Sequence, residues 1–319
     1  MFAPAPDSAG SGHDARARSG GGLPAPRTGL PGPLDPGLVD ALVRAGLEED
    51  SGPGDVTSAT SVPEGARARA RLRAKAEGTL AGLDLFTHAF EVTDPKARIV
   101  RHRQDGDRIA VGDIVAEVEG LARALLTAER IGLNFIQRMS GIATLTARFV
   151  SLAEGRARIL DTRKTTPGLR VLERYAVRCG GGENHRFGLF DEAMVKENHI
   201  ELAGRPLVEV LTSMRSELGP GVRITSEARD RAEAEDGVRG GADVVLLDNM
   251  SPATMSELCP VLRALASERG RPVELEASGG IDLTTLAAVS ASGVDRISIG
   301  ALTHSAPALD LSLDLEPCA

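Results

Sequence analysis

The densest group of side chains able to do chemistry lies between residues 161 and 199, in the segment DTRKTTPGLRVLERYAVRCGGGENHRFGLFDEAMVKENHI. A guanidinium group binds carboxylate or phosphate oxygens in pairs, whereas an ammonium group is a mobile point charge. Such a concentration of cations stands out in a chain whose formal net charge is -8. We interpret it as the binding site of a small polyanion, formed by Arg163, Lys164, His185, Arg186 and Lys196.

Two carboxylates, Glu227 and Asp248, come at the ends of two later apolar runs. Carboxylates beside cations can hold Mg²⁺ through water, bind the hydroxyl groups of a sugar, or stabilise a developing positive charge. They can also neutralise neighbouring lysines, and these roles are compatible with one another. We therefore treat both residues as candidate catalytic groups and as indirect ligands of a metal ion.

Glycine-rich turns follow the last two apolar runs of the chain, at Ser278-Gly279-Gly280 and at Gly300-Ala301. Barrel enzymes often bind phosphate with the loops after their final strands and with the N–H groups of a helix amino terminus. The alternative is a pair of glycine turns without a ligand. Together, these patterns predict an enzyme whose small substrates carry phosphate and carboxylate groups.

The elements that must position these side chains are six short apolar runs, each followed by a polar or glycine-rich tail. Parallel strands separated by helix-length segments are typical of an α/β barrel whose active site lies at the carboxyl ends of its strands. Six strands are fewer than the usual eight, so either the barrel is open or two strands were missed. The runs are residues 158–160, 193–195, 222–225, 244–247, 273–277 and 297–299.

A smaller α+β domain is predicted before the barrel. Helical spacing begins near Leu34, and alternating residues with turn signals between positions 66 and 120 indicate an antiparallel sheet. Residues 121–153 then read as buried helix, which we expect Ser140-Gly141 to break in two. Arg130 lies within this apolar stretch, where a buried cation needs an anionic partner.

The composition excludes several other classes of protein. An acidic chain with a pI near 5.4 lacks the basic face that nucleic-acid binding requires. No apolar stretch is long enough for a membrane span, and the amino terminus lacks the apolar core of a secretory signal. Cys179, Cys259 and Cys318 have no disulfide-framework or metal-ligand spacing. We expect a cytoplasmic enzyme that binds neither nucleic acid nor membranes.

Several motifs, in order and spacing, resemble those of the quinolinate phosphoribosyltransferase family, the carboxylating nicotinate-nucleotide pyrophosphorylases. The resemblance extends from about Leu34 to the carboxyl end of the chain. Its motifs are EDSGPGDVTS, ERIGLNFIQRMSGIA, TRKTTPGLR, GGGENHRFGL, VKENHI, LLDNMSP, LEASGGI and SIGALTHS.

The resemblance implies that quinolinate and phosphoribosyl pyrophosphate react with Mg²⁺ to give nicotinate mononucleotide, pyrophosphate and CO₂ in de novo NAD biosynthesis. It also implies a homodimer whose open six-stranded α/β barrel packs on a smaller α+β sandwich domain. We accordingly divide the chain into a disordered extension at 1–33, a sandwich domain at 34–139 joined by 306–319, and a catalytic barrel at 140–305.

The family's site residues carry over onto matching positions of this chain. Arg130 would enter the quinolinate site from the partner subunit, and Lys164, Lys196, Glu227 and Asp248 would be the catalytic groups. The quinolinate site would contain Arg163, His185, Arg186 and Lys196. The phosphoribosyl pyrophosphate and metal site would contain Lys164, Glu227 and Asp248, with phosphate-binding loops at Ser278, Gly279, Gly280 and Gly300.

One position departs from the family pattern, because Thr225 stands where the family usually has a second glutamate. Three alternatives to this function remain open. The chain could use another heteroaromatic acid on the same fold, or it could be a ligand-binding relative without catalysis. It could also be an aldolase-like barrel that uses Lys196 covalently.

Overall fold

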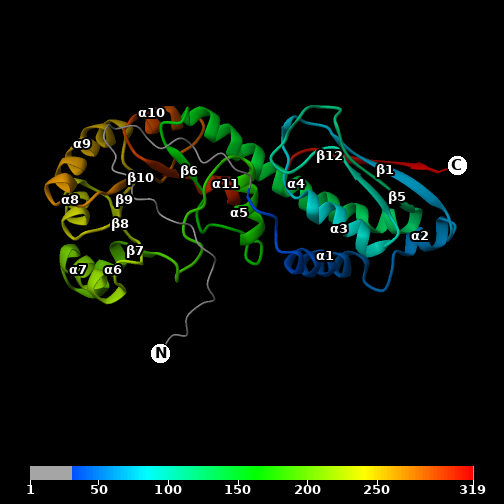
Figure 1. The fold of residues 1–319 in the computed structure, drawn as a ribbon, viewed down its shortest axis with the longest axis horizontal. Coiled ribbons are helices and arrows are strands. Elements are labelled where there is room, and N and C mark those ends of the chain that lie inside the picture. The colour runs from blue at the N-terminus through cyan, green and yellow to red at the C-terminus, as the bar shows by residue number, and fades with distance from the viewer. Residues whose placement is uncertain (1–30, 319) are drawn as a thin grey trace.

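The computed structural model describes residues 31–318, which form two main sheets joined by a long helix (Figure 1). The expected disordered extension lies, except for residues 31–33, outside the described part of the chain. None of the described helices is both long and apolar enough to span a membrane. The six-stranded sheet carries the predicted polar tails, and the four-stranded sheet lies at the other end of the molecule.

The larger sheet is parallel and has the order β6-β11-β10-β9-β8-β7. The expectation of six strands is confirmed, and the sheet is open because β6 and β7, at its two edges, do not pair within residues 31–318. The apolar runs locate each strand to within a few residues. Their bounds are β6 (Arg158–Leu160), β7 (Ala193–Val195), β8 (Ile224–Ala228), β9 (Val244–Asp248), β10 (Glu274–Ser278) and β11 (Arg296–Ser298).

Helices connect these strands and cover the outer side of the sheet, as Figure 1 shows. The helices are α5 (Arg170–Cys179), α6 (Glu197–Ala203), α7 (Leu207–Leu218), α8 (Arg231–Arg239), α9 (Pro252–Glu268), α10 (Leu286–Ala291) and α11 (Ala301–His304). Two of these helices are capped at their amino termini by short polar side chains. Asp230 accepts the N–H of Glu233 at the start of α8, and Ser251 accepts the N–H of Thr254 at the start of α9.

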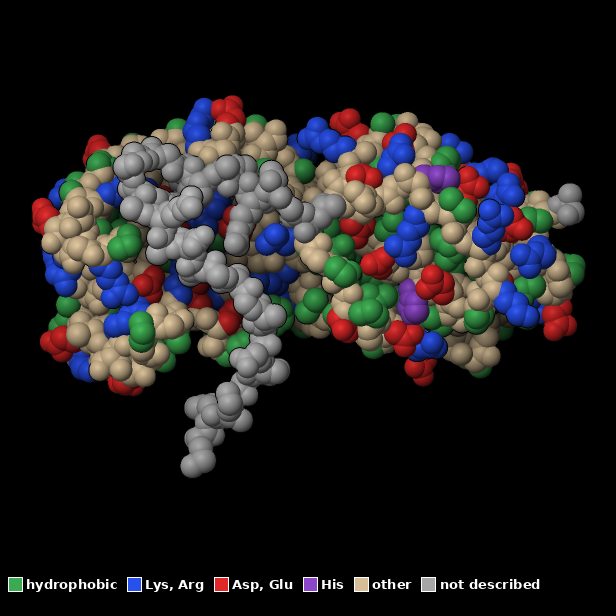
Figure 2. Space-filling view, viewed as in Figure 1, with side chains coloured by type: hydrophobic (Ala, Val, Ile, Leu, Met, Phe, Trp, Pro, Cys, Tyr) green, Lys and Arg blue, Asp and Glu red, His purple; other side chains and the backbone are tan. Residues whose placement is uncertain are grey.

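The smaller sheet is antiparallel, with the order β12-β1-β5-β3. Strand β1 alternates arginine with buried alanine and leucine, so one side packs in the core and the other carries charge. Its arginines pair with acidic residues of β5 and β12, and Figure 2 shows basic and acidic side chains interspersed over this half. The bounds are β1 (Arg67–Ala74), β3 (Arg98–Arg101), β5 (Ile114–Leu121) and β12 (Leu311–Pro317).

Three helices and a two-stranded ribbon complete this half of the molecule. Helix α3 packs against both α1 and the long helix α4, and Phe86 and Phe90 of α3 are fully buried. The elements are α1 (Pro36–Ser51), α2 (Val56–Ser61), α3 (Leu83–Thr93), β2 (Gly78–Thr79) and β4 (Arg108–Ile109).

Helix α4 (Ala122–Ala153) is continuous, so the predicted break at Ser140-Gly141 is wrong. Ser140 Oγ accepts the N–H of Ala81 at 3.0 Å and donates to its carbonyl at 3.1 Å. A Cβ atom on Gly141 would lie 2.0 Å from the carbonyl oxygen of Pro307. Both residues therefore permit close packing against other segments, and they do not end the helix.

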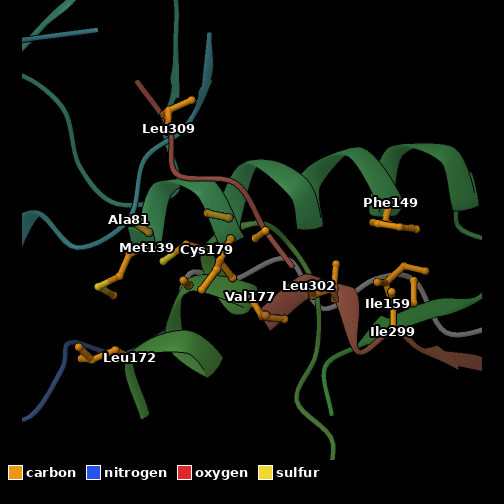
Figure 3. Close-up of a cluster of buried hydrophobic side chains, with 14 of the residues drawn as sticks. Ala81, Met139, Phe149, Ile159, Leu172, Val177, Cys179, Ile299, Leu302 and Leu309 are labelled. Atoms are coloured by element: carbon orange, nitrogen blue, oxygen red, sulfur yellow. The ribbon is translucent and has the colours of Figure 1, made fainter. Parts of the chain in front are cut away.

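The core beneath α4 connects the two halves of the molecule. Figure 3 shows Met139 and Phe149 of this helix in a buried cluster with Ala81, which precedes α3, and Ile159 of β6. Residues of α5 and α11 complete the cluster. The helix thus packs the six-stranded barrel and the antiparallel sheet onto one shared core.

Candidate active site

The polar tails of the six parallel strands surround one pocket with a volume of about 490 Å³. Most of the predicted residues line it, and Thr162, Met194, Leu246, Asn249 and Ser298 complete its wall. Glu227 and Asp248 come together there because β8 and β9 are adjacent and parallel. The predicted residues in the lining are Arg163, Lys164, His185, Arg186, Lys196, Glu227, Asp248, Ser278, Gly279 and Gly280.

Arg163 and Arg186 form the cationic end of this pocket. Arg186 donates through Nη1 to the carbonyl of Glu192 at 3.0 Å. Burial lowers the pKa of Arg186, and the neighbouring positive charge of Arg163 lowers it further. The Nε of Arg163 is buried without a hydrogen-bond partner among the described residues. Two close guanidinium groups with unused donors provide a site for an anion that carries more than one carboxylate.

The loop that carries Arg163 and Lys164 is held by residues that the sequence analysis did not identify. The buried Glu173 carboxylate accepts the N–H of Thr166 at 3.1 Å and its hydroxyl at 2.9 Å. Thr303 Oγ1 donates to the carbonyl of Lys164 at 2.7 Å. The available signal for Glu173 was a carboxylate in the first turn of an amphipathic helix, and alone it indicates only a favourable helix start.

Asp161, at the end of β6, fixes the second cationic loop. Its wholly buried carboxylate accepts the N–H of His185 at 2.7 Å and the amide of Asn184 at 2.6 Å. Burial raises the pKa of Asp161, while the nearby Arg174 opposes that change. The loop is thereby anchored to the strand that also precedes Arg163.

Two of the three glycines before this loop, Gly180 and Gly182, permit close packing. A Cβ atom on Gly180 would lie 2.4 Å from the carbonyl oxygen of Ala143, and one on Gly182 would lie 2.8 Å from Thr146 Cγ2. Both contacts are with α4. The absence of a side chain at these two positions therefore lets the backbone of the loop lie against the long helix.

The carboxylates have different neighbours. Glu227 forms an ion pair with Lys196 on the adjacent strand end, which fits the neutralising role considered for it. Asp248 accepts the side-chain amide of Asn249 at 2.8 Å, and within residues 31–318 no lysine or arginine pairs with it. Asp248 is thus the carboxylate that remains available to a bound substrate.

The turn after β10 presents backbone to the pocket. Gly279 has φ 91°, and a Cβ atom on it would lie 2.3 Å from Asn249 Oδ1. Gly280 has φ 61°, but a Cβ atom there would meet open space. Throughout the described chain, the N–H groups of these two glycines have no protein acceptor. Left-handed backbone with free N–H groups is an arrangement that can bind an anion.

Two predicted residues do not line the pocket. Gly300 immediately precedes α11, and a Cβ atom on it would lie 3.2 Å from Lys164 Cδ, so it lies next to the pocket behind Lys164. Arg130 is exposed on α4, so the expectation that it is a buried cation is wrong for the chain taken by itself. The helix turns this position outward, although its neighbours Ile131 and Leu133 are buried.

Thr225, the departure from the expected pattern, is wholly buried in β8. Its hydroxyl donates to Glu192 Oε1 at 2.5 Å. The Glu192 carboxylate, from the segment before β7, therefore lies beside the threonine that replaces the usual glutamate. Glu192 also raises the pKa of Arg186.

Comparison with known proteins agrees with this architecture. The family model "Quinolinate phosphoribosyl transferase, N-terminal domain" matches residues 55–140, and the corresponding C-terminal domain matches residues 142–314. A probable nicotinate-nucleotide pyrophosphorylase (carboxylating) of Bacillus subtilis is 42% identical over 268 residues, covering 84% of this chain and 90% of the relative.

A second relative and a solved structure agree with the first. The chloroplastic nicotinate-nucleotide pyrophosphorylase (carboxylating) of Arabidopsis thaliana is 40% identical, covering 87% of this chain and 83% of its own. NadC from Streptococcus pyogenes superposes with a TM-score of 0.84 at 37% identity, covering 91% of this chain and 100% of that structure. Both domain models and these relatives span the barrel and the antiparallel sheet, and the chain therefore belongs to the quinolinate phosphoribosyl transferase family.

Proposed function

We propose that this chain transfers the phosphoribosyl group of phosphoribosyl pyrophosphate to quinolinate in NAD biosynthesis. The products are nicotinate mononucleotide, pyrophosphate and CO₂. The observation that carries this proposal is the distribution of charge around one pocket: paired guanidinium groups, two carboxylates, and a turn with free backbone N–H groups. The names of the relatives support the same activity.

Quinolinate would occupy the cationic end of the pocket. It carries two neighbouring carboxylates, and the Arg163 and Arg186 guanidinium groups can each bind one through paired hydrogen bonds. Lys196 adds a cation that is partly neutralised by Glu227. Schiff-base chemistry needs a lysine amine that is free to attack a carbonyl, whereas Lys196 is engaged by Glu227, which argues against the aldolase-like alternative.

Phosphoribosyl pyrophosphate would occupy the other end. The free N–H groups of Gly279 and Gly280 can donate hydrogen bonds to a phosphate. The flexible side chain of Lys164 can keep its positive charge beside the pyrophosphate as that group departs. Asp248 would lie near the ribose. Departure of pyrophosphate leaves positive charge on the ribose ring, and a carboxylate held beside the ring stabilises such charge.

The reaction needs no covalent nucleophile from the protein. The C1–O bond of the ribose breaks with its electron pair leaving on pyrophosphate, and the quinolinate nitrogen donates its lone pair to C1. The quaternised nitrogen then accepts the electrons left when the adjacent carboxylate departs as CO₂, and a proton replaces that group on the ring. The protein holds the two reactants in line, which is where most of the acceleration would arise.

The pocket fits Mg²⁺ that arrives with the pyrophosphate. Within the described residues, no group of three or more His, Cys, Asp or Glu side chains could form a metal site alone. Mg²⁺ usually keeps several waters and binds through one or two carboxylates plus substrate phosphates. Asp248 and Glu227 would hold the ion indirectly, and when bound it would neutralise charge on the leaving group.

We also propose that the enzyme is a cytoplasmic homodimer. The three cysteines are free, and Cys179 and Cys259 are buried, which suits a reducing compartment. Arg130 would reach the quinolinate site of the partner subunit. This proposal gives a role to an exposed arginine on α4 that the pocket of its own chain does not include.

Calorimetry followed by a turnover assay tests the function. Quinolinate should bind the purified protein, and addition of phosphoribosyl pyrophosphate with Mg²⁺ should then release pyrophosphate. Binding of quinolinate without pyrophosphate release would instead identify a ligand-binding relative that lacks catalysis.

A further inference from the structure

His185 lines the pocket, yet both of its ring nitrogens face protein groups. Nδ1 accepts the backbone N–H of Arg186 at 2.7 Å. Nε2 lies 3.3 Å from Oε1 of Glu276, and only 8% of the residue is exposed. Because Nδ1 accepts a hydrogen bond, the ring proton belongs on Nε2, where it faces the Glu276 carboxylate.

Glu276 is a buried carboxylate that the proposed chemistry does not use. It lies in the middle of β10, has no exposed surface, and does not line the pocket. Arg296, its cross-strand neighbour on β11, lies 2.7 Å from Oε2 through Nε. A buried charge is costly unless it is paired, so the arginine explains how the carboxylate is tolerated. It does not explain why a carboxylate is directed at His185.

We propose that Glu276 is a positioning residue for the quinolinate site, which rests on the function proposed above. Its carboxylate fixes the His185 ring in one tautomer and orientation. The ring in turn holds the backbone N–H of Arg186, so that the Arg186 guanidinium faces the substrate carboxylates. Supporting groups of this kind determine how closely a binding side chain keeps its productive geometry.

The competing explanation is that Glu276 and Arg296 form only a structural ion pair inside the barrel. Glu274 provides a matched control, because it lies two residues earlier on the same strand. It pairs with Arg158 at 2.9 Å and Arg296 at 3.7 Å, but it has no contact with His185. Both carboxylates belong to the same charged network, and only Glu276 connects it to the pocket.

The test uses the double variant Glu276→Met with Arg296→Met, which removes the acceptor without leaving a buried arginine unpaired. Apolar replacement of a whole buried pair is often tolerated by the fold. The 3.3 Å contact between His185 and Glu276 is electrostatic, since its geometry does not meet that of a hydrogen bond. We expect the KM for quinolinate to rise about tenfold, a loss comparable in size to that of one ordinary hydrogen bond. The KM for phosphoribosyl pyrophosphate should change less than about twofold, well below the loss of one hydrogen bond.

Two further measurements separate positioning from structure. The ¹⁵N spectrum of His185, assigned with a His185→Gln sample, should show one tautomer protonated at Nε2 in the wild type and a mixture in the double variant. Glu276→Gln, which keeps an oxygen acceptor, should recover much of the quinolinate affinity, and Glu274→Gln should leave that affinity unchanged.

The proposal is overturned if the folded double variant binds quinolinate as the wild type does, or if the His185 tautomer is unaltered. It is also overturned if Glu274→Gln weakens quinolinate binding as strongly as the double variant does. The ¹⁵N measurement needs no turnover. A wild type that fails to use quinolinate but shows the Nε2 tautomer would therefore contradict the proposed function and leave the Glu276 contact in place.

Discussion

The Arg138 guanidinium and the Glu173 carboxylate form an ion pair with an Nη2–Oε1 distance of 2.8 Å, connecting α4 with α5. Arg138 also donates to the carbonyls of Ala306 and Thr303, and Glu173 binds Thr166 in the loop after Lys164. The long helix therefore holds both sides of the loop that carries the cations of the pocket. This relationship explains how a helix shared by both halves controls active-site geometry.

Glu173→Gln should destabilise the protein by about 1.5–3 kcal/mol, because it removes the charge from buried hydrogen bonds. It should also raise the KM for phosphoribosyl pyrophosphate, since the loop with Lys164 loses an anchor. Urea unfolding and steady-state kinetics would measure both effects. Glu268→Gln, at an exposed end of α9, is the matched control and should change neither.

The proposal that Arg130 enters the site of a partner subunit can be tested by complementation. Arg130→Ala should abolish turnover while leaving the melting temperature unchanged, because the side chain is exposed in its own chain. Lys164→Ala should also be inactive. In a mixed dimer, one of the two sites would then contain both native residues, so mixing the variants should restore activity. Mixed dimers that form but remain inactive would rule out an Arg130 contribution across the subunit interface.

The two glycines after β10 should respond differently to alanine. Gly279→Ala should destabilise the fold by about 1–2 kcal/mol from left-handed backbone strain alone, and contact with Asn249 should add to the loss. Gly280→Ala also places alanine in a left-handed conformation, but its Cβ atom would meet open space. This substitution should therefore affect phosphate binding more than it affects stability. Kinetics should show a raised KM for phosphoribosyl pyrophosphate and an unchanged KM for quinolinate. An equal change in both would contradict a dedicated phosphate turn.

The stability of the protein should depend on pH through the buried carboxylate of Glu276. Burial would raise the pKa of Glu276, but His185 and the charge of Arg296 outweigh it and lower the value from 4.5 to about 2. Because the pKa of Glu276 is lower in the folded than in the unfolded protein, its charge contributes its full stabilisation at pH values above the unfolded pKa of 4.5. This stabilisation is lost as the pH falls toward 2. Glu276→Gln should cost about 3 kcal/mol near pH 7, the lower end of the range for breaking a buried ion pair, because Arg296 loses its nearer carboxylate and keeps that of Glu274 at 3.7 Å.

That cost should shrink when the pH falls from about 4.5 to about 2, because the wild-type carboxylate is then being protonated as well. Urea unfolding of both proteins at pH 7 and at pH 3 gives the comparison. A difference in unfolding free energy that is the same at both pH values would show that the charge of Glu276 does not contribute to stability.

The pattern of apolar runs with polar tails was sufficient to predict six parallel strands and most of the pocket lining, since strand ends in a parallel sheet converge. It was insufficient where a residue's role depends on a distant contact. Ser140-Gly141 reads as a helix break until the backbones of Ala81 and Pro307 are seen against it. Glu173 and Glu276 were missed because Glu173 resembles a favourable helix start, and Glu276 is one of two glutamates that alternate with other residues in a short strand, where nothing in the sequence marks it as the one that faces His185.

The central claim is that the paired guanidinium groups of Arg163 and Arg186 select a substrate with two carboxylates. The most direct test supplies the purified enzyme with phosphoribosyl pyrophosphate and Mg²⁺, and compares quinolinate with nicotinate, which has one carboxylate. We predict formation of nicotinate mononucleotide from quinolinate, with one CO₂ released for each pyrophosphate, and no turnover of nicotinate. Turnover of nicotinate without turnover of quinolinate would contradict the claim.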